Sequence, residues 1–568
     1  MRSDWAAGLG AFVLVAALGL DEGGYPSSAW GWSSVVLLGV LAVILARGAR
    51  MPRPAALVAI GALAALTAWQ AASILWSSHV SASILEVERT LTYVGVVAVF
   101  VLAGSAPAVP AGVLAAATLL CGYGLARFED GERLAEPIGY ANGVGILAVM
   151  GLLLSVALAT RAVRTGFACA AAAAVPILAA SLYLTFSRGA WLALGVGLAA
   201  TVAIGPQRLR LAAIALALAV PATLAAAAAE QLALVVALCA VAAAIPLGLR
   251  AAPAPPPAAR TAFAVVLAVI PVLVVVAALA KVGGPQAAWD SFRAAPTPTH
   301  GQASARVFDL SGRNRADYWS VAWHSYEDDP LLGAGAGTYA RTWLRERPVP
   351  QPVTDAHSLY LETLAELGPI GLVLLLTALA APFAGYRSPW AAATLAPYTA
   401  FLAHAAQDWD WELAAVTVAG LLCGIAAIAG QAGSRIPRLP AVLPAALCLA
   451  AAFAFAGNHA LERSIDAMDD LRWGEAAREA RRARTLQPWS PEPWRVLGEV
   501  ELAEGSLPVA RDYFRGGLRE DPDEFELWIG LGLASDGFAR RSAFERAYRL
   551  NPLSPDLKEL GFKTTSRG

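Results

Sequence analysis

Three segments, far apart along an otherwise apolar chain, contain polar side chains that could bind an anion and move a proton. Arg188 begins the segment "RGAWL", and His357 begins the segment "HSLYLETLAELGPIG". Between them, Arg313 and Arg315 lie in "SGRNRADYW". A guanidinium group holds phosphate through two parallel hydrogen bonds, and a neutral imidazole can take a proton from a hydroxyl group. These residue types suit the binding of a phosphate group and the activation of a hydroxyl.

Each arginine also has a simpler interpretation, in which it contacts lipid headgroups at the membrane surface. Two features of Arg188 favour anion binding: its expected place on the outer face, where anchoring arginines are disfavoured, and its position at a helix start, where free N–H groups attract anions. Arg313 and Arg315 precede residues 318–326, whose Trp and Tyr side chains at helical spacing predict a helix at the membrane surface.

His357 is expected in the first turn of a helix that Thr354 or Asp355 caps. The positive end of that helix disfavours a charged imidazole, so we expect a neutral ring that can act as a base. The alternative is a hydrogen-bonded histidine at the membrane interface with no chemical role.

The composition indicates a polytopic membrane protein. Of 568 residues, 57% are hydrophobic and only 15% are charged, with a mean hydropathy of +0.56, whereas about a quarter of a soluble domain is charged. The net charge of -1 gives no sign of a nucleic-acid partner. All five cysteines lie in apolar runs without CxxC spacing, so they are interpreted as core residues.

Apolar runs of about 20 residues mark the helices that cross a bilayer. Candidate spans lie near residues 5–20, 33–47, 54–76, 91–104, 107–126, 140–160, 165–185, 189–205, 209–228, 230–250, 261–281, 361–384, 388–406, 413–430 and 440–458. The sequence therefore predicts an all-α transmembrane bundle of about 12–15 spans.

Charge orients this bundle. With the N-terminus in the cytoplasm, arginines such as Arg50, Arg161 and Arg387 fall in the inner turns, and acids such as Glu86 and Asp408 fall in the outer turns. The outer face then holds the loop of residues 283–355, the start of the span at 189–205, His357, and everything after residue 459.

The last hundred residues are charged and repetitive. The stretch "PWRVLGEVELAEGSLPVARDYFRGGLREDP" has the Trp, Gly, Ala, Phe and Pro spacing of a tetratricopeptide repeat, and shifts of 34 residues find matching positions on both sides. The sequence thus predicts two domains: 1–460 in the membrane and 465–568 as an extracytoplasmic α-solenoid. Such solenoids usually bind proteins or peptides on a concave face, although a spacer or stabilising cap is the alternative.

The order of the motifs resembles the O-antigen ligase and O-antigen polymerase superfamily of bacterial polytopic membrane proteins. The resemblance rests on R-x3-L at 188–192, on H-S-x9-G-x-x-G at 357–371, and on a large outer loop between them that ends in "PLLGAGAGTY". The stretch "RLAEPIGYANGVGILAVMGL" before a span is also similar. The resemblance covers roughly residues 50–430 and does not extend to the repeats.

This resemblance implies a metal-independent, inverting glycosyltransferase with a GT-C-like helical fold and no cofactor. Members transfer a glycan from undecaprenyl diphosphate to an acceptor at the outer face of the cytoplasmic membrane. By motif, Arg188 and Arg313 would hold the donor diphosphate, with Arg315 as an alternative to Arg313. His357 would activate or position the acceptor hydroxyl. Protein acceptors, or a partner docked on the repeats, are further possibilities beside lipid or glycan acceptors.

Three alternatives stay open. A polymerase of the same superfamily shares these motifs. A transporter, or a scaffold that recruits envelope proteins through the repeats, would not need them, but no inverted repeat or charged path through the spans is evident. Finally, "AHAAQDWDWEL" at 403–413 contains an Asp-x-Asp pair that could bind a divalent cation. We favour a solvated turn there, or carboxylates that orient an acceptor, and predict no metal.

Overall fold

The computed structural model describes residues 2–103, 108–129, 131–162, 164–204, 207–251, 280–281, 283–294, 311–437 and 439–562. Helices dominate these residues, and one two-stranded sheet accompanies them in the described part of the chain. The predicted all-α, multi-pass architecture is confirmed. The span expected at 261–281 lies, apart from its last two residues, outside the described residues.

Nine helices in the described part are long and apolar enough to cross a membrane. They are α2 (Ser27–Ala46), α3 (Pro54–Ser73), α5 (Ala108–Ala126), α6 (Ala141–Arg161), α7 with α8 (Thr165–Ala173 and Val175–Leu184), α10 (Arg208–Ala227), α11 (Leu232–Ala251), α16 (Leu359–Ala380) and α19 (Val442–Asp469). Further helices of the same bundle are α1 (Arg2–Leu20), α4 (Val80–Ala103), α9 (Arg188–Ile204), α17 (Ala391–Ala405) and α18 (Ala414–Ala426).

Helix α4 begins at Val80, well before the span expected at 91–104. Its N-terminal half contains Glu86 and Arg89, and their charge hides this part of the helix from a hydropathy search. Arg89 is buried and pairs with Glu86 and with Glu412 from a distant turn. Charged residues among membrane helices face the protein interior and pair with one another in this way.

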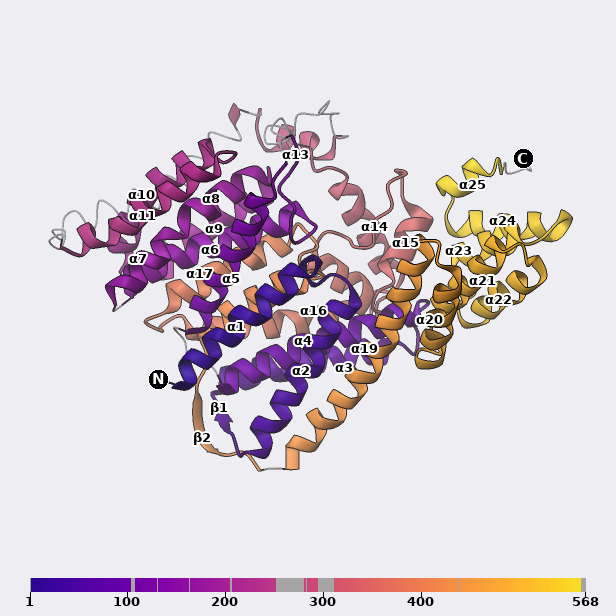
Figure 1. Ribbon diagram of the computed structural model, residues 1–568, viewed down its shortest axis with the longest axis horizontal. Coiled ribbons are helices and arrows are strands. Elements are labelled where there is room, and N and C mark those ends of the chain that lie inside the picture. Colours follow the sequence, from indigo (N-terminus) through magenta and orange to yellow (C-terminus); the bar gives the residue numbers. More distant parts are fainter. Residues whose placement is uncertain are drawn as a thin grey trace.

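Helix α6 lies at the centre of the bundle, with 94% of its apolar window buried. Helices α5, α7, α8, α9 and α17 pack around it (Figure 1). Small residues permit the contact with α9, because a Cβ at Gly145 would lie only 2.9 Å from the Cβ of Ala190. Such residues are typical of helix contacts in membranes, where close packing holds the helices together.

A short antiparallel two-stranded sheet joins two turns that are distant in sequence. Strand β1 (Arg50–Pro52) pairs with β2 (Gln431–Arg435), with Arg50 opposite Arg435 (Figure 1). No alternating pattern predicts these strands. Both belong to turns that the charge pattern places on the inner face, so the pairing fixes two arginine-containing turns side by side.

The segment before α16 contains three described helices. They are α13 (Pro285–Arg293), α14 (Arg315–Asp328) and α15 (Tyr339–Glu346). Helix α14 covers the stretch for which a surface helix is predicted. The glycine run 333–337 turns the chain towards α15, and a Cβ at Gly333 would lie 2.3 Å from the backbone carbon of Glu366. The turn therefore lies directly against α16.

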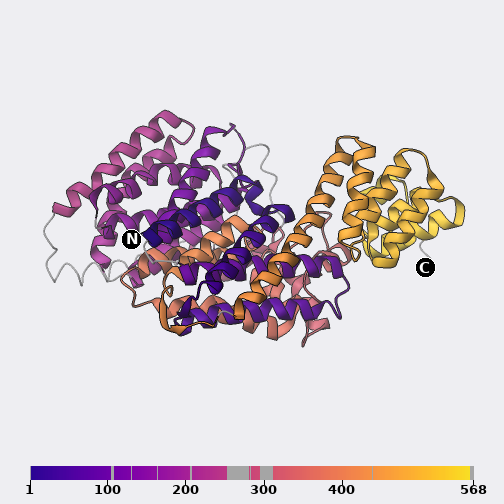
Figure 2. The same cartoon turned by 60° about the horizontal axis from the view of Figure 1, so that its bottom comes forward.

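Six helices follow α19 and form what we call the C-terminal unit, residues 473–559. They are α20 (Trp473–Leu486), α21 (Glu492–Ala503), α22 (Leu507–Glu520), α23 (Phe525–Leu533), α24 (Gly537–Leu550) and α25 (Pro555–Glu559). They project from the bundle (Figure 2). Ala476, Ala480 and Phe514, which belong to the repeat pattern, are fully buried between neighbouring helices. The assignment to tetratricopeptide repeats stays a prediction.

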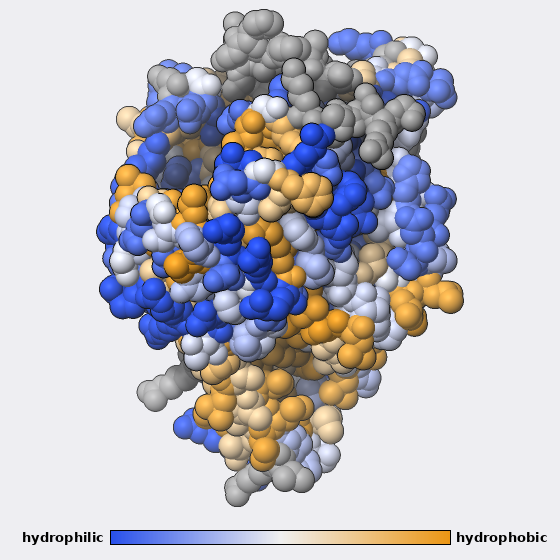
Figure 3. Space-filling model, turned by 90° about the vertical axis from the view of Figure 1, so that its right-hand side faces the viewer, coloured by the Kyte–Doolittle hydropathy of each residue, from blue (hydrophilic) through white to orange (hydrophobic). Residues whose placement is uncertain are grey.

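Helix α19 connects the bundle to the C-terminal unit without a break. It packs against α2 on one side of the junction and α20 on the other. The predicted boundary between 460 and 465 therefore falls inside one helix, and the division into two domains stays a prediction. In Figure 3 hydrophilic side chains cover the C-terminal helices nearest the viewer, and hydrophobic side chains gather below them.

Candidate functional site

Asp408, in the turn between α17 and α18, is the centre of a hydrogen-bonded group at one end of the bundle. Its carboxylate accepts hydrogen bonds from Tyr140 Oη at 2.8 Å and from Asn142 Nδ2 at 2.6 Å. Arg315, at the start of α14, forms an ion pair with Asp408 at 3.0 Å and donates from Nε to the backbone oxygen of Gln407 at 2.6 Å. Because Asp408 is only 1% exposed, three distant segments meet at one buried carboxylate.

Charge pairing outweighs burial at this carboxylate. Burial alone would raise the pKa of Asp408, but the Arg315 guanidinium and the nearby histidines lower that pKa to about 2. Burial likewise opposes the charge on Arg315, whose pKa is nevertheless raised because Asp408 lies beside it. Both side chains are therefore charged at neutral pH.

Arg188 begins α9 at the same end of the bundle. Its Nη2 atom donates a hydrogen bond to the backbone oxygen of Ser311 at 2.8 Å. The next residue, Gly189, accepts a hydrogen bond from Gln407 Nε2 at 3.4 Å. The start of α9 therefore contacts both the segment that contains Arg313 and the turn that contains Asp408.

Arg133 is a further guanidinium of this group, and the sequence interpretation did not assign it. Its Nε donates to the backbone oxygen of Thr185 at 2.8 Å, and its Nη2 donates to Asn142 Oδ1 at 2.7 Å. Burial lowers the pKa of Arg133, and the charges of Arg313 and Arg315 act in the same direction. Arg133 therefore lies close enough to Arg313 and Arg315 to feel their charge. The available signal was an arginine nine residues before an asparagine at the start of a span.

His357 lies two residues before α16 rather than in its first turn, so that part of the prediction is wrong. Ser358 is the N-cap residue, and no side chain caps the helix. The Thr354 hydroxyl donates instead to the buried Asp355 carboxylate. His357 Nδ1 lies 3.1 Å from the backbone oxygen of Asp355. A carbonyl oxygen can only accept, so Nδ1 carries the proton and Nε2 is left as the basic nitrogen.

The His357 ring packs on Tyr318 of α14, with ring centroids 4.9 Å apart. Trp319 Nε1 donates to the backbone oxygen of His357 at 3.4 Å. Tyr318 is one turn of helix from Arg315. The first turns of α14 thus join the segment of His357 to the group of Arg188 and Asp408.

Four non-glycine residues in these segments have a left-handed backbone. The φ angles are 46° at Phe186, 50° at Arg313, 68° at Asn314 and 53° at His357. Such conformations cost of order 1–3 kcal/mol and concentrate at functional sites, where the surrounding contacts impose them. Two of the three predicted segments contain such a residue, and Phe186 lies two residues before the third, which begins at Arg188.

The turn at residues 404–412 differs from its prediction. Asp408, Asp410 and Glu412 are all at least nine-tenths buried, so the expected solvated turn is wrong. The Asp-x-Asp pair also does not converge on one point, because Asp408 pairs with Arg315 while Asp410 pairs with His404. Among the described residues, Glu412 instead joins Asp355 and Glu362 in a separate group of possible metal ligands.

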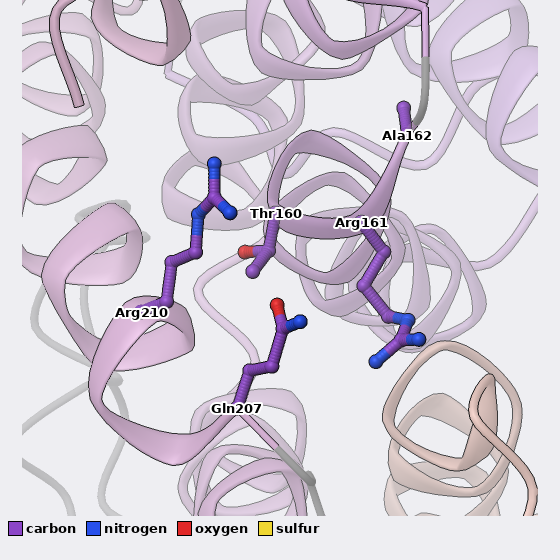
Figure 4. Close-up of a pocket in the computed structure, with 5 residues that line it drawn as sticks. All are labelled: Thr160, Arg161, Ala162, Gln207 and Arg210. Atoms are coloured by element: carbon purple, nitrogen blue, oxygen red, sulfur yellow. The ribbon is translucent and has the colours of Figure 1, made fainter. Parts of the chain in front are cut away.

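A cavity of about 300 Å³ lies at the C-terminal end of α6, opposite the end that contains Asn142. It is lined by Thr160, Arg161, Ala162, Gln207 and Arg210 (Figure 4). At 1.5 Å per residue, the length of α6 separates this cavity from Asn142 by roughly 30 Å. It therefore takes no part in the group around Asp408.

Comparison with known families decides what kind of domain carries these residues. Residues 173–376 match the family model of the O-antigen ligase. The match spans Arg188, Arg313, Arg315 and His357, and it leaves out Arg133, Asp408 and the C-terminal unit. A comparison with curated proteins gave no match.

The chain is therefore a multi-pass membrane protein with an O-antigen ligase domain, and this domain indicates membrane glycan processing by an enzyme. The match covers less than half of the 568 residues. An O-antigen ligase family implies a lipid-linked glycan donor and a glycan or lipid acceptor.

Proposed function

We propose that the protein transfers a glycan from undecaprenyl diphosphate to an acceptor hydroxyl at the outer face of the cytoplasmic membrane. The observation that carries this proposal is the convergence of the three polar segments on the start of α14. Arg188 contacts Ser311 there, and His357 packs on Tyr318. The charge pattern of the turns supports an outer location with the N-terminus in the cytoplasm.

In this reaction, Arg188 and Arg313 hold the donor diphosphate. The guanidinium of Arg315 is already engaged by Asp408 and Gln407, so we assign Arg315 to positioning the start of α14. Preorganised guanidinium groups stabilise the charge that accumulates on a departing diphosphate, so the transfer needs no metal at that group.

His357 acts on the acceptor. Its Nε2 atom accepts the proton of the acceptor hydroxyl while the hydroxyl oxygen attacks the anomeric carbon of the donor. The bond from that carbon to the diphosphate oxygen breaks, and undecaprenyl diphosphate leaves with the electron pair. A single displacement of this kind inverts the configuration at the anomeric carbon.

A polymerase differs from a ligase only in its acceptor, which would be another lipid-linked glycan. The C-terminal unit favours an acceptor or partner that is held outside the bundle, because its helices project from the bundle (Figure 2) and contact α15 through Arg341. A non-enzymatic scaffold remains the alternative from another class, and it predicts no transfer at all.

Reconstitution of the purified full-length protein with a labelled undecaprenyl-diphosphate glycan tests the proposal. We expect label to move to an added lipid, glycan or protein acceptor, with release of undecaprenyl diphosphate. Label that remains on the lipid with every acceptor class, in protein that is folded and correctly inserted, would exclude the transferase and leave the scaffold.

A further inference from the structure

Apart from the acids around Asp408, a separate group of acidic side chains includes Asp355, two residues before His357. Asp355 precedes α16, Glu362 lies in its first turn, and Glu412 belongs to the turn before α18. Each offers one carboxylate oxygen, and these three oxygens lie within 4.8 Å of one another. The start of α16 and the turn before α18 therefore bring ligand-type oxygens close together.

Two of these three residues, Glu362 and Glu412, border a small space. Glu362 and Glu412 line a cavity of about 20 Å³, together with Gln70, Glu86 and Glu366. A cavity needs about 10–15 Å³ to hold one water molecule. The space thus fits a single ion or a single water and is too small for a glycan.

The negative charge of this group is only partly compensated by the described residues. Arg89 pairs with Glu86 and Glu412. The Glu366 carboxylate accepts hydrogen bonds from the backbone N–H groups of Gly337 and Tyr339, both at 2.9 Å. Oxygen ligands in such a setting attract a hard cation, because unpaired carboxylate charge is costly away from water.

Asp355 and Glu362 receive hydrogen bonds but no ion pair in the described part of the chain. Asp355 accepts from Thr354, and Glu362 Oε2 accepts from the backbone N–H of Ala356 at 2.7 Å. Two buried carboxylates thus remain without a paired cation. A cation between them would supply the missing charge.

Gln70 gives an independent indication of a ligand. Its side chain lines the same cavity and is only 5% exposed. Within the described residues, its Oε1 atom is buried and has no hydrogen-bond partner. An unpaired buried amide oxygen is costly, and amide oxygens are common ligands of Ca²⁺.

We propose that Asp355, Glu362, Glu412 and Gln70 bind one divalent cation of about the size of Ca²⁺. Ca²⁺ lies 2.3–2.6 Å from its oxygen ligands, so three carboxylate oxygens within 4.8 Å of one another can all reach one ion. An amide ligand favours Ca²⁺ over Mg²⁺, which demands near-ideal octahedral geometry and gives up its water reluctantly.

The cation would hold the turn that presents His357. Asp355 supplies a carboxylate ligand, and its backbone oxygen also accepts the Nδ1 proton of His357. The ion would then fix residues 354–358 in place. Asp355 and Glu362 are positioning residues in this arrangement, and binding of the cation does not depend on the proposed transfer reaction.

Equilibrium binding of ⁴⁵Ca²⁺ to the chelator-treated, full-length protein in nanodiscs tests the site, with thermal unfolding measured in parallel. We expect one saturable site and a rise in Tm with Ca²⁺ that Mg²⁺ reproduces only at a higher concentration. Glu362→Gln, which keeps the side-chain shape, and Gln70→Leu should each weaken Ca²⁺ binding at least tenfold. Among the described residues, Asp521 and Glu524 form another group of possible ligands with His79. Asp521→Asn and Glu524→Gln should leave Ca²⁺ binding at the proposed site unchanged.

A folding defect can be separated from loss of the site. Without Ca²⁺, Glu362→Gln should unfold at the same or a higher temperature than the natural protein, because it removes a buried carboxyl group that lies among other acids. Absence of saturable Ca²⁺ binding by the natural protein would overturn the proposal. Unchanged affinity in both Glu362→Gln and Gln70→Leu would do the same by placing the ion elsewhere. Neither result bears on glycan transfer, which the reconstitution experiment measures separately.

Discussion

The guanidinium of Arg315 and the carboxylate of Asp408 form a buried ion pair although 93 positions separate them in the chain. This pair attaches the outer segment that starts α14 to the turn between α17 and α18. Asn142 and Tyr140 bind the same carboxylate, so the first turns of α6 join the arrangement as well. The predictions below follow from this connection and from the contacts around it.

Removal of either partner of this pair should loosen the site. Asp408→Asn leaves Arg315 buried beside a neutral group, and the loss of one partner from a buried pair costs about 3–5 kcal/mol. We expect a lower Tm together with a loss of transfer. Asp512→Asn on α22, whose side chain is 80% exposed, is the matched control and should change neither. An unchanged Tm in Asp408→Asn would show that the pair does not hold α14 in place.

The pair also predicts an acid-dependent loss of stability. The pKa of Asp408 is about 2, below its ordinary value of 3.8. Because this pKa is depressed in the folded state, the contribution is complete above about pH 4 and is lost as the pH falls through about 4 to 2. The difference in Tm between the natural protein and Asp408→Asn should therefore shrink over that interval. A difference that is constant from pH 6 to pH 3 would contradict the assigned charge state.

Substitution of the transfer residues should abolish activity without affecting insertion. Arg188→Ala removes a group that stabilises the departing diphosphate, worth about 100-fold or more in rate. His357→Ala removes the base, worth about 10²–10⁴-fold. Initial rates with labelled donor, measured in equal amounts of inserted protein, check both values.

Arg210→Ala provides the control for these two variants. Arg210 lines the cavity at the other end of the bundle (Figure 4), so its loss should leave the transfer rate within about twofold of the natural protein, since it contacts none of the reacting groups. Rates close to natural in both Arg188→Ala and His357→Ala would remove the basis of the proposed mechanism.

Arg341 of α15 should hold the C-terminal unit against the outer segment. It pairs with Asp521 and with Glu524, the latter at 3.3 Å, and donates to the backbone oxygen of Ser78. Arg341→Gln leaves two buried carboxylates without their cation. We expect cleavage near Leu471, in the turn after α19, to become about tenfold faster in limited proteolysis, as opening becomes less costly.

The same variant separates docking from chemistry. Transfer to a small soluble acceptor should persist in Arg341→Gln, while transfer that depends on a partner bound by the C-terminal unit should fall. Arg482→Gln on α20, with a side chain that is 57% exposed, should leave proteolysis unchanged. Equal cleavage rates in the two variants would show that the C-terminal unit is held by other contacts.

The membrane architecture and the candidate site residues could both be predicted from the amino-acid sequence. Burial of about 20 apolar residues per helix is a local requirement, so runs such as 140–160 coincide with helices, in that case α6. The hydropathy pattern did not predict the first part of α4, because Glu86 and Arg89 lower its hydropathy. Their burial depends on a partner from a distant turn, Glu412, which pairs with Arg89.

Which polar residues pair with one another could be seen only in the three-dimensional structure. The sequence predicts that the acids at 404–412 form one surface cluster. In the structure they pair with three different side chains, since Asp408 pairs with Arg315, Asp410 with His404 and Glu412 with Arg89. His357 lies outside the helix that it was expected to begin, because Asp355 faces Glu362 and Glu412 instead of capping α16. Charge pairing between buried groups depends on which helices meet, and that depends on packing across the whole bundle rather than on local sequence.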